Sequence, residues 1–206
     1  MANIKPSIHF VELIASLINK NPTPIRIAEI GVDCGATTRE IVNLLRRDDI
    51  YDLFDVSDCT LFSNFDKIIT SGHCAVNIFG NTRKLYDSYA WTIANLYMKL
   101  VDEAKNTHIW YAVYIDGAHS FSVDAPTTCC VKEMIKSGGF IVFDDMKWSF
   151  AKSPTCNTET MRGRYTVEQM NKPHVALIVN VFMRSDPRFV EISKIGESCA
   201  VFSKIK

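Results

Sequence analysis

The feature that most constrains the fold is an apolar segment that runs into a glycine-containing loop, between Arg26 and Glu40. Its first half is rich in β-branched residues, which is typical of a strand buried on both faces of a sheet. Gly31 and Gly35 follow, and glycine lets the backbone turn tightly and approach a ligand. Thr37 and Thr38 are predicted to cap the next helix. A strand, a glycine loop and a helix start predict an α/β domain whose loop presents backbone N–H groups to a ligand.

Length and composition narrow the class of protein. A chain of 206 residues is enough for one α/β domain, so residues 1–206 are expected to form a single domain. Its 23 basic and 23 acidic side chains balance, which does not favour a nucleic-acid or membrane partner. No apolar run approaches the roughly 20 residues of a membrane span, and residues 1–22 predict an amphipathic helix instead of a secretion signal. We therefore expect a soluble, cytoplasmic protein.

The seven cysteines lack C-x-x-C spacing and are odd in number. They are interpreted as reduced core residues and not as a disulfide framework or a zinc site.

Strand-like and helix-like segments alternate along the chain. Further strands are expected at 49–56, 75–79, 109–115 and 140–143, and an antiparallel pair at 189–192 and 200–203 is joined through Gly196. Helices are expected at 8–21, at 84–105 and at 167–183, where Pro173 lies near the true start. A shorter helix that runs through Met134 is expected to stop at Ser137-Gly138-Gly139. Residues 147–165 lack periodicity and are interpreted as a substrate loop or lid. The order predicts a mostly parallel sheet with helices on both faces.

In such sheets a ligand binds beyond the carboxyl ends of the strands. Asp55 falls at one of these ends, where a carboxylate can accept both hydroxyls of a ribose, and the other reading is a solvated acid. Asn81 follows the next strand, where its amide is interpreted either as reading an adenine edge or as serving only the turn.

Three further acids follow two other strands. Asp116 ends the segment Ile109–Ile115, and Asp144 and Asp145 directly follow Phe143. Carboxylates that converge raise one another's pKa unless a cation neutralises them. Ligands that are all oxygen suit Mg²⁺, Mn²⁺ or Ca²⁺ better than zinc. The other interpretation is that one or two of these acids cap loops.

Two motifs carry a resemblance to a known family. The spacing Glu29-x-Gly31-x-x-x-Gly35, which is not the G-x-G-x-x-G of dinucleotide-binding proteins, resembles motif I of class I S-adenosylmethionine-dependent methyltransferases. Ile-Asp-Gly-x-His at 115–119, followed by Gly-Gly-x-x-x-x-Asp-Asp at 138–145, resembles the metal-dependent O-methyltransferases of small molecules and sugars, including the macrolide-sugar enzymes. The resemblance covers about residues 25–148. It implies a Rossmann-like class I methyltransferase fold with a seven-stranded sheet.

The resemblance also implies roles for individual residues. Asp116, Asp144 and Asp145 would be ligands of Mg²⁺ or Mn²⁺, and His119 with Asp116 would be catalytic. Ala118 stands where many members carry a second acid as the candidate base, so His119 is the group expected to take the proton. S-adenosylmethionine would be bound by Glu29, Gly31, Gly35, Thr37, Thr38, Asp55, Asn81 and Asp116.

The expected reaction is methyl transfer to a hydroxyl of a sugar or another small polar acceptor. A divalent ion would lower the pKa of that hydroxyl and hold it in line with the methyl group. Two alternatives stay open at this stage. One is a nicotinamide-dependent oxidoreductase, which three clustered acids disfavour, and the other is a non-catalytic cofactor-binding module. A homo-oligomer is possible, and the acceptor's identity does not follow from the sequence.

Overall fold

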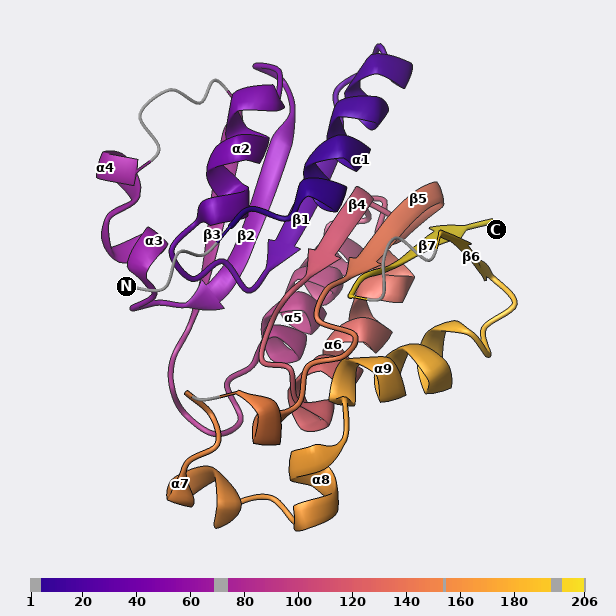
Figure 1. Ribbon diagram of the computed structural model, residues 1–206. Coiled ribbons are helices and arrows are strands. Elements are labelled where there is room, and N and C mark those ends of the chain that lie inside the picture. Colours follow the sequence, from indigo (N-terminus) through magenta and orange to yellow (C-terminus); the bar gives the residue numbers. More distant parts are fainter. Residues whose placement is uncertain (1–4, 69–73, 154, 194–197, 206) are drawn as a thin grey trace.

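The strands form one sheet in the order β3-β2-β1-β4-β5-β7-β6 (Figure 1). The computed structural model describes residues 5–68, 74–153, 155–193 and 198–205. Its first five strands are parallel and its last two are antiparallel. Their bounds are β1 Arg26–Ile30, β2 Ile50–Val56, β3 Ala75–Asn81, β4 Trp110–Ile115, β5 Ile135–Phe143, β6 Phe189–Ser193 and β7 Ala200–Lys204. The Rossmann-like fold and its closing antiparallel pair are therefore confirmed, while the turn predicted at Gly196 lies outside the described residues.

Helices cover both faces of the sheet, as the strand–helix alternation predicts (Figure 1). Along β1, Ile27 packs with α1 and α2 on one face, and Ala28 packs with α5, α6 and α9 on the other. The helices are α1 Ile8–Lys20, α2 Ala36–Leu44, α3 Thr60–Ser63, α4 Phe65–Ile68, α5 Tyr89–Asp102, α6 Phe121–Met134, α7 Glu159–Arg162, α8 Val167–Asn171 and α9 His174–Ile178, with short turns η1 Phe150–Lys152 and η2 Val179–Met183. Among the described residues no helix is long and apolar enough to cross a membrane.

The parallel register aligns the carboxyl ends of four neighbouring strands. Ile30 of β1 pairs with Phe54 of β2 and with Ile115 of β4, and Ile115 pairs with Phe143 of β5. The residue after each of these four paired positions is predicted to bind a ligand, namely Gly31, Asp55, Asp116 and Asp144. The register therefore brings those residues to one rim of the sheet.

The end predicted for the helix that runs through Met134 is wrong. Helix α6 stops at Met134, and Gly138 and Gly139 lie inside β5 instead of ending the helix. A glycine cap is not needed because the ammonium of Lys204 donates to the carbonyls of Lys132 and Ile135 at the helix end, over 3.1 and 3.0 Å. Gly139 instead allows a close approach to β4, since a Cβ there would lie 3.0 Å from the carbonyl oxygen of Tyr111.

Two other predicted helices are shorter in the structure. The helix expected from residue 84 begins at Tyr89, where the hydroxyl of Ser88 accepts the backbone N–H of Trp91. The helix expected at 167–183 is broken before Pro173 into α8 and α9. A proline breaks a helix because it lacks an N–H and its ring clashes with the preceding turn. Within the predicted loop, η1 and α7 add two short helical turns.

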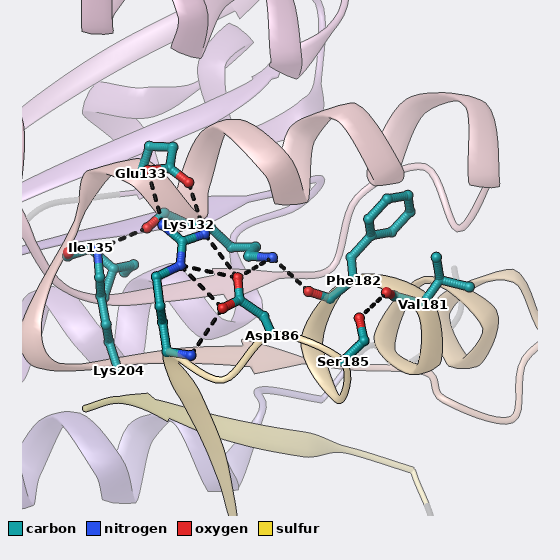
Figure 2. Close-up of polar contacts among 9 residues, drawn as sticks. Lys132, Glu133, Ile135, Val181, Phe182, Ser185, Asp186 and Lys204 are labelled. Atoms are coloured by element: carbon teal, nitrogen blue, oxygen red, sulfur yellow. Dashed lines mark hydrogen bonds and ion pairs between the residues drawn. The ribbon is translucent and has the colours of Figure 1, made fainter. Parts of the chain in front are cut away.

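A cluster of charged side chains joins the last strands to α6 (Figure 2). The ammonium of Lys132 lies 2.7 Å from a carboxylate oxygen of Asp186 and donates to the carbonyl of Phe182 over 2.6 Å. Arg188 binds the same carboxylate and also pairs with Glu133. Together with Lys204, these contacts fix β6 and β7 against the end of α6. The position of β7 matters because its other end lies beside the candidate site.

We predict that Asp186→Asn lowers the free energy of unfolding by about 3 kcal/mol at pH 7, because it leaves the buried Lys132 without its counter-charge. Hydrogen bonds from Arg188 and Lys132 lower the pKa of Asp186 in the fold. The contribution of Asp186 to the free energy of unfolding is therefore complete above the unfolded pKa of about 3.9, and it is lost as the pH falls toward the folded pKa. Urea denaturation at pH 7, 5 and 3 should show the difference between wild type and variant shrinking only at pH 3. Asp58→Asn, which removes an exposed pair with Arg83, is the control and should change little.

Candidate active site

Most of the predicted site residues line one cavity of about 370 Å³ at the carboxyl ends of the strands. The predicted residues in its wall are Glu29, Gly31, Thr37, Asp55, Asp116, His119 and Asp145. A larger cavity of about 590 Å³, beside α5 and β3, contains none of the predicted residues. The chemistry-bearing side chains thus identify the smaller cavity as the candidate site.

Gly31 is required by the contact between the first loop and the end of β4. Its φ is +87°, and a Cβ there would lie 2.0 Å from the carbonyl oxygen of Asp116. No side chain fits at that distance. Gly35 has φ +75° and precedes the first residue of α2. The two glycines therefore shape the loop as the sequence predicts.

The capping role predicted for Thr37 and Thr38 is wrong. Helix α2 begins at Ala36 after Gly35, and no side chain caps it. The hydroxyl of Thr37 accepts the backbone N–H of Ser7 over 3.0 Å, which ties the segment before α1 to the cavity. Thr38 donates to a carboxylate oxygen of Glu29 over 2.7 Å. The two threonines lie two and three residues beyond the N-cap position, which Gly35 occupies, so they cannot cap the helix.

Glu29 is buried and lines the cavity. Its carboxyl group also accepts a hydrogen bond from the hydroxyl of Tyr51. Burial raises the pKa of Glu29 to about 8, although the bonds from Tyr51 and Thr38 act against the shift. The side chain is therefore mostly protonated at neutral pH. A ligand ammonium group near this carboxyl would favour its ionised form.

Asp55 fixes the glycine loop by accepting hydrogen bonds from its backbone. One of its carboxylate oxygens accepts the backbone N–H groups of Val32 and Asp33, each over 2.7 Å. The other accepts the N–H of Val56 over 2.6 Å. The carboxylate lies at the cavity, as predicted. It also fixes the glycine loop, a role that the sequence did not indicate.

Asn81 lies in an adjoining cavity of about 300 Å³, and Tyr89 lines both cavities. The amide nitrogen of Asn81 donates to the Asp87 carboxylate, the Ser88 carbonyl and the Thr92 hydroxyl. These acceptors fix which amide atom is the oxygen. That oxygen is buried and has no hydrogen-bond partner among the described residues. A buried acceptor without a partner is costly, so this atom is suited to a ligand N–H group.

Asp116, His119 and Asp145 form a compact group in which one ligand atom from each lies within 4.8 Å of the others. Nε2 of His119 is 3.1 Å from a carboxylate oxygen of Asp116 and 3.1 Å from one of Asp145. Burial opposes the charged form of the ring, yet the two carboxylates outweigh it and raise the pKa of His119 to about 10. The imidazolium therefore supplies the positive charge that two converging carboxylates require. Two carboxylates and an imidazole are also a donor set that divalent cations accept.

Asp144 does not join this group in the described structure. Its carboxylate accepts hydrogen bonds from the Tyr114 hydroxyl and, over 2.9 Å, from the Cys199 thiol. Burial and the neighbouring carboxylate raise the pKa of Cys199 to about 12, so the thiol is protonated and donates. The prediction that Asp144 is a metal ligand stays a prediction.

Sequence reasoning missed four residues at the site: Lys5, Tyr89, Tyr114 and Cys199. Tyr114 follows the alternation of β4, so its position two residues before Asp116 was a usable signal. The others come from distant parts of the chain, and no local pattern marks them. Of the two aromatic residues after Asp145, Trp148 lies over His119 with ring centroids 4.9 Å apart, whereas Phe150 is buried. All seven cysteines are free, as predicted, but only Cys59 and Cys199 are buried in the core; four others are partly buried and Cys129 is exposed.

Comparisons with known proteins agree with this geometry. A family model described as a methyltransferase domain matches residues 28–146. No curated protein matches the sequence significantly. A candidate caffeoyl-CoA O-methyltransferase from Staphylococcus aureus superposes with a TM-score of 0.61 at 16% identity, over 96% of this chain and 84% of that chain.

Two other solved structures contain a ligand. An O-methyltransferase from Bacillus cereus in complex with S-adenosylhomocysteine has a TM-score of 0.55 and 13% identity, over 97% of this chain and 82% of that chain. The MycE methyltransferase of the mycinamycin biosynthetic pathway, in complex with Mg and S-adenosylhomocysteine, has a TM-score of 0.59 and 14% identity. That alignment covers 95% of this chain and 48% of the MycE chain, so this chain spans about half of MycE. At these identities the solved structures establish the fold.

The raised pKa of Glu29 gives a stability prediction. The folded state holds a proton on Glu29 between the unfolded pKa of about 4.3 and the folded value of about 8, so unfolding becomes easier as the pH rises through this window. The slope is at most about 1.4 kcal/mol per pH unit. Glu29→Gln should remove this decline and be more stable than wild type at pH 8. Equal pH dependence of urea unfolding in the two proteins would show that Glu29 is ionised in the fold.

Proposed function

The chain belongs to the methyltransferase domain family, and from this premise we propose that it transfers a methyl group from S-adenosylmethionine to a hydroxyl of a small polar acceptor, assisted by a divalent cation. The observation that carries the proposal is the pair of adjoining cavities at the strand ends. One is lined by the glycine loop and the carboxylates, and the other is lined by Asn81, whose buried amide oxygen has no hydrogen-bond partner among the described residues.

The two cavities suit the two halves of the cofactor. The loop at Gly31 and the carboxyl group of Glu29 would face the methionine part, whose ammonium favours a carboxylate. Asp55, in the wall of the first cavity, would accept a ribose hydroxyl at the oxygen that receives a single backbone N–H. The oxygen of Asn81 would accept the exocyclic amino group of adenine. Lys5 is a basic residue in a wall rich in acids and would pair with the methionine carboxylate.

Asp116 and Asp145 are the proposed main ligands of a cation, with Asp144 beside them, because their oxygens face a common point now held by a protonated ring. A bound divalent cation supplies a positive charge that lowers the pKa of the acceptor hydroxyl. His119 takes the hydroxyl proton only as a neutral imidazole, when Nε2 is released from both carboxylates. The ring of Trp148 packs against the ring of His119, with centroids 4.9 Å apart. Family membership argues against the nicotinamide-dependent alternative.

The cofactor proposal predicts a specific preference for adenine. Wild-type protein should bind S-adenosylhomocysteine more tightly than S-inosylhomocysteine by about 1–3 kcal/mol, because the inosine carbonyl would face the buried amide oxygen. Asn81→Ala should abolish this preference, whereas Asn95→Ala on the exposed surface of α5 should keep it. Isothermal titration calorimetry with both ligands and NAD measures these differences. Tight binding of NAD without binding of the adenosyl ligands would contradict the proposal.

The catalytic proposal predicts different effects for two neighbouring residues. Once an acceptor is found by screening sugars and phenols with methyl-labelled cofactor, a chelator should abolish transfer, and Mg²⁺ or Mn²⁺ should restore it. His119→Ala should lower kcat by about 10²–10⁴, the usual effect of losing a positioned base, with little change in cofactor affinity. Asp116→Asn should abolish cation-dependent turnover. If full activity persists in chelator, these acids have a structural role.

A further inference from the structure

A cavity of about 520 Å³ lies at the opposite end of β5 from the candidate active site. Lys136 and Ser137 in its wall belong to the start of β5, whereas Asp144 follows the end of the same strand. Among the described residues no acid belongs to the wall, which is formed by Asn106, His108, Lys136, Ser137, Arg188 and Lys204. Each of these side chains can donate a hydrogen bond. A cavity lined by donors and cations suits an anion.

The ammonium of Lys204 is the least compensated of these donors. The residue is only 4% exposed, and it forms no ion pair with the part of the chain that the structure describes. Its ammonium donates to the carbonyls of Lys132 and Ile135 (Figure 2). An ammonium has three N–H groups, so one of them is left for a ligand. Burial lowers the pKa of Lys204, and an anion beside it would favour the charged form.

Lys136 supplies a second charge without a counter-ion among the described residues. Its ammonium lies over the ring of Tyr111, 4.1 Å from the centroid. An aromatic face holds a cation in place and leaves N–H groups available on the side away from the ring. Arg188, by contrast, is already shared between Asp186 and Glu133. Lys136 and Lys204 therefore carry the charge that the cavity offers to a ligand.

The ionic cluster around the cavity has more positive than negative charge (Figure 2). Its two carboxylates are those of Asp186 and Glu133, and both are already paired with cations. Four cationic side chains belong to the cluster or to the cavity wall: Lys132, Lys136, Arg188 and Lys204. Four positive charges against two negative ones leave two positive charges. A phosphate monoester carries close to two negative charges at neutral pH.

We propose that this cavity binds the dianionic phosphate group of a small molecule, with Lys136 and Lys204 as the main contacts and with His108 and Ser137 as further donors. The cavity is larger than a phosphate ion, so it has room for the organic part of a phosphomonoester. The inference does not depend on the proposed methyl transfer, because none of these residues lines the cofactor cavity.

The test is a calorimetric titration of the full-length protein with inorganic phosphate and with glucose 6-phosphate at pH 7.5. Wild type should bind at least one of them saturably. Lys136→Gln removes one of the two available charges and should weaken that binding about tenfold or more, the effect of losing a hydrogen bond between charged groups. Lys136→Arg keeps the charge and the donors and should bind nearly as tightly as wild type. Tighter binding of the ester assigns the site to a phosphomonoester, and tighter binding of inorganic phosphate assigns it to the free ion.

Two further variants separate a specific site from a general effect of charge. Lys99→Gln removes the same charge from the exposed surface of α5 and should leave phosphate binding unchanged. Lys204→Met should weaken phosphate binding as Lys136→Gln does, and thermal unfolding of this variant checks that it still folds without the bonds to the end of α6. The inference is overturned if neither phosphate compound binds wild type saturably, if Lys136→Gln binds like wild type, or if Lys99→Gln weakens binding as much as Lys136→Gln.

Discussion

The close contact between the first glycine loop and the end of β4 is the constraint on which the site depends. Gly31 lies against the carbonyl of Asp116 at a distance that admits no Cβ. This contact is possible because β1 and β4 are parallel neighbours whose ends are in register. Once it forms, the cofactor loop and the acidic group become walls of one cavity. A slip in register would separate the two, so the pairing of β1 with β4 determines whether a cofactor and a cation could be held together.

Charge balance is the second constraint, and the structure resolves it differently on the two sides of the cavity. At the glycine loop, Glu29 becomes neutral because its pKa is raised by burial. At the rim, Asp116 and Asp145 share the proton of His119. The first arrangement suits a ligand that brings its own positive charge, and the second suits a cation. The positively charged groups of the proposed cofactor fit the first arrangement, and the proposed divalent cation fits the second.

Much of the fold followed from the sequence because its signals are local. The strand at Trp110–Ile115 and the following Asp116 are marked by a continuous apolar run and a polar stop, and both are confirmed. The convergence of acids at one rim also followed, since parallel strands end on the same side. What failed depends on distant contacts. The end of α6 is set by Lys204, about 70 residues later. The hydrogen bond from Cys199 to Asp144 also comes from a distant part of the chain, and no local pattern indicates it. Gly138 and Gly139 are a pattern typical of a helix end, but α6 already ends at Met134, where Lys204 binds its last carbonyls.

The central claim is that one rim binds the cofactor in two adjoining cavities beside a cation. A crystal structure of the protein with S-adenosylhomocysteine and Mn²⁺ tests it most directly, because Mn²⁺ is located by its anomalous scattering. The account predicts an anomalous peak between Asp116 and Asp145, the homocysteine moiety against Gly31, and the adenine amino group on the oxygen of Asn81. Adenine bound away from Asn81, or Mn²⁺ bound elsewhere while Asp116 and Asp145 still hold His119, would contradict it.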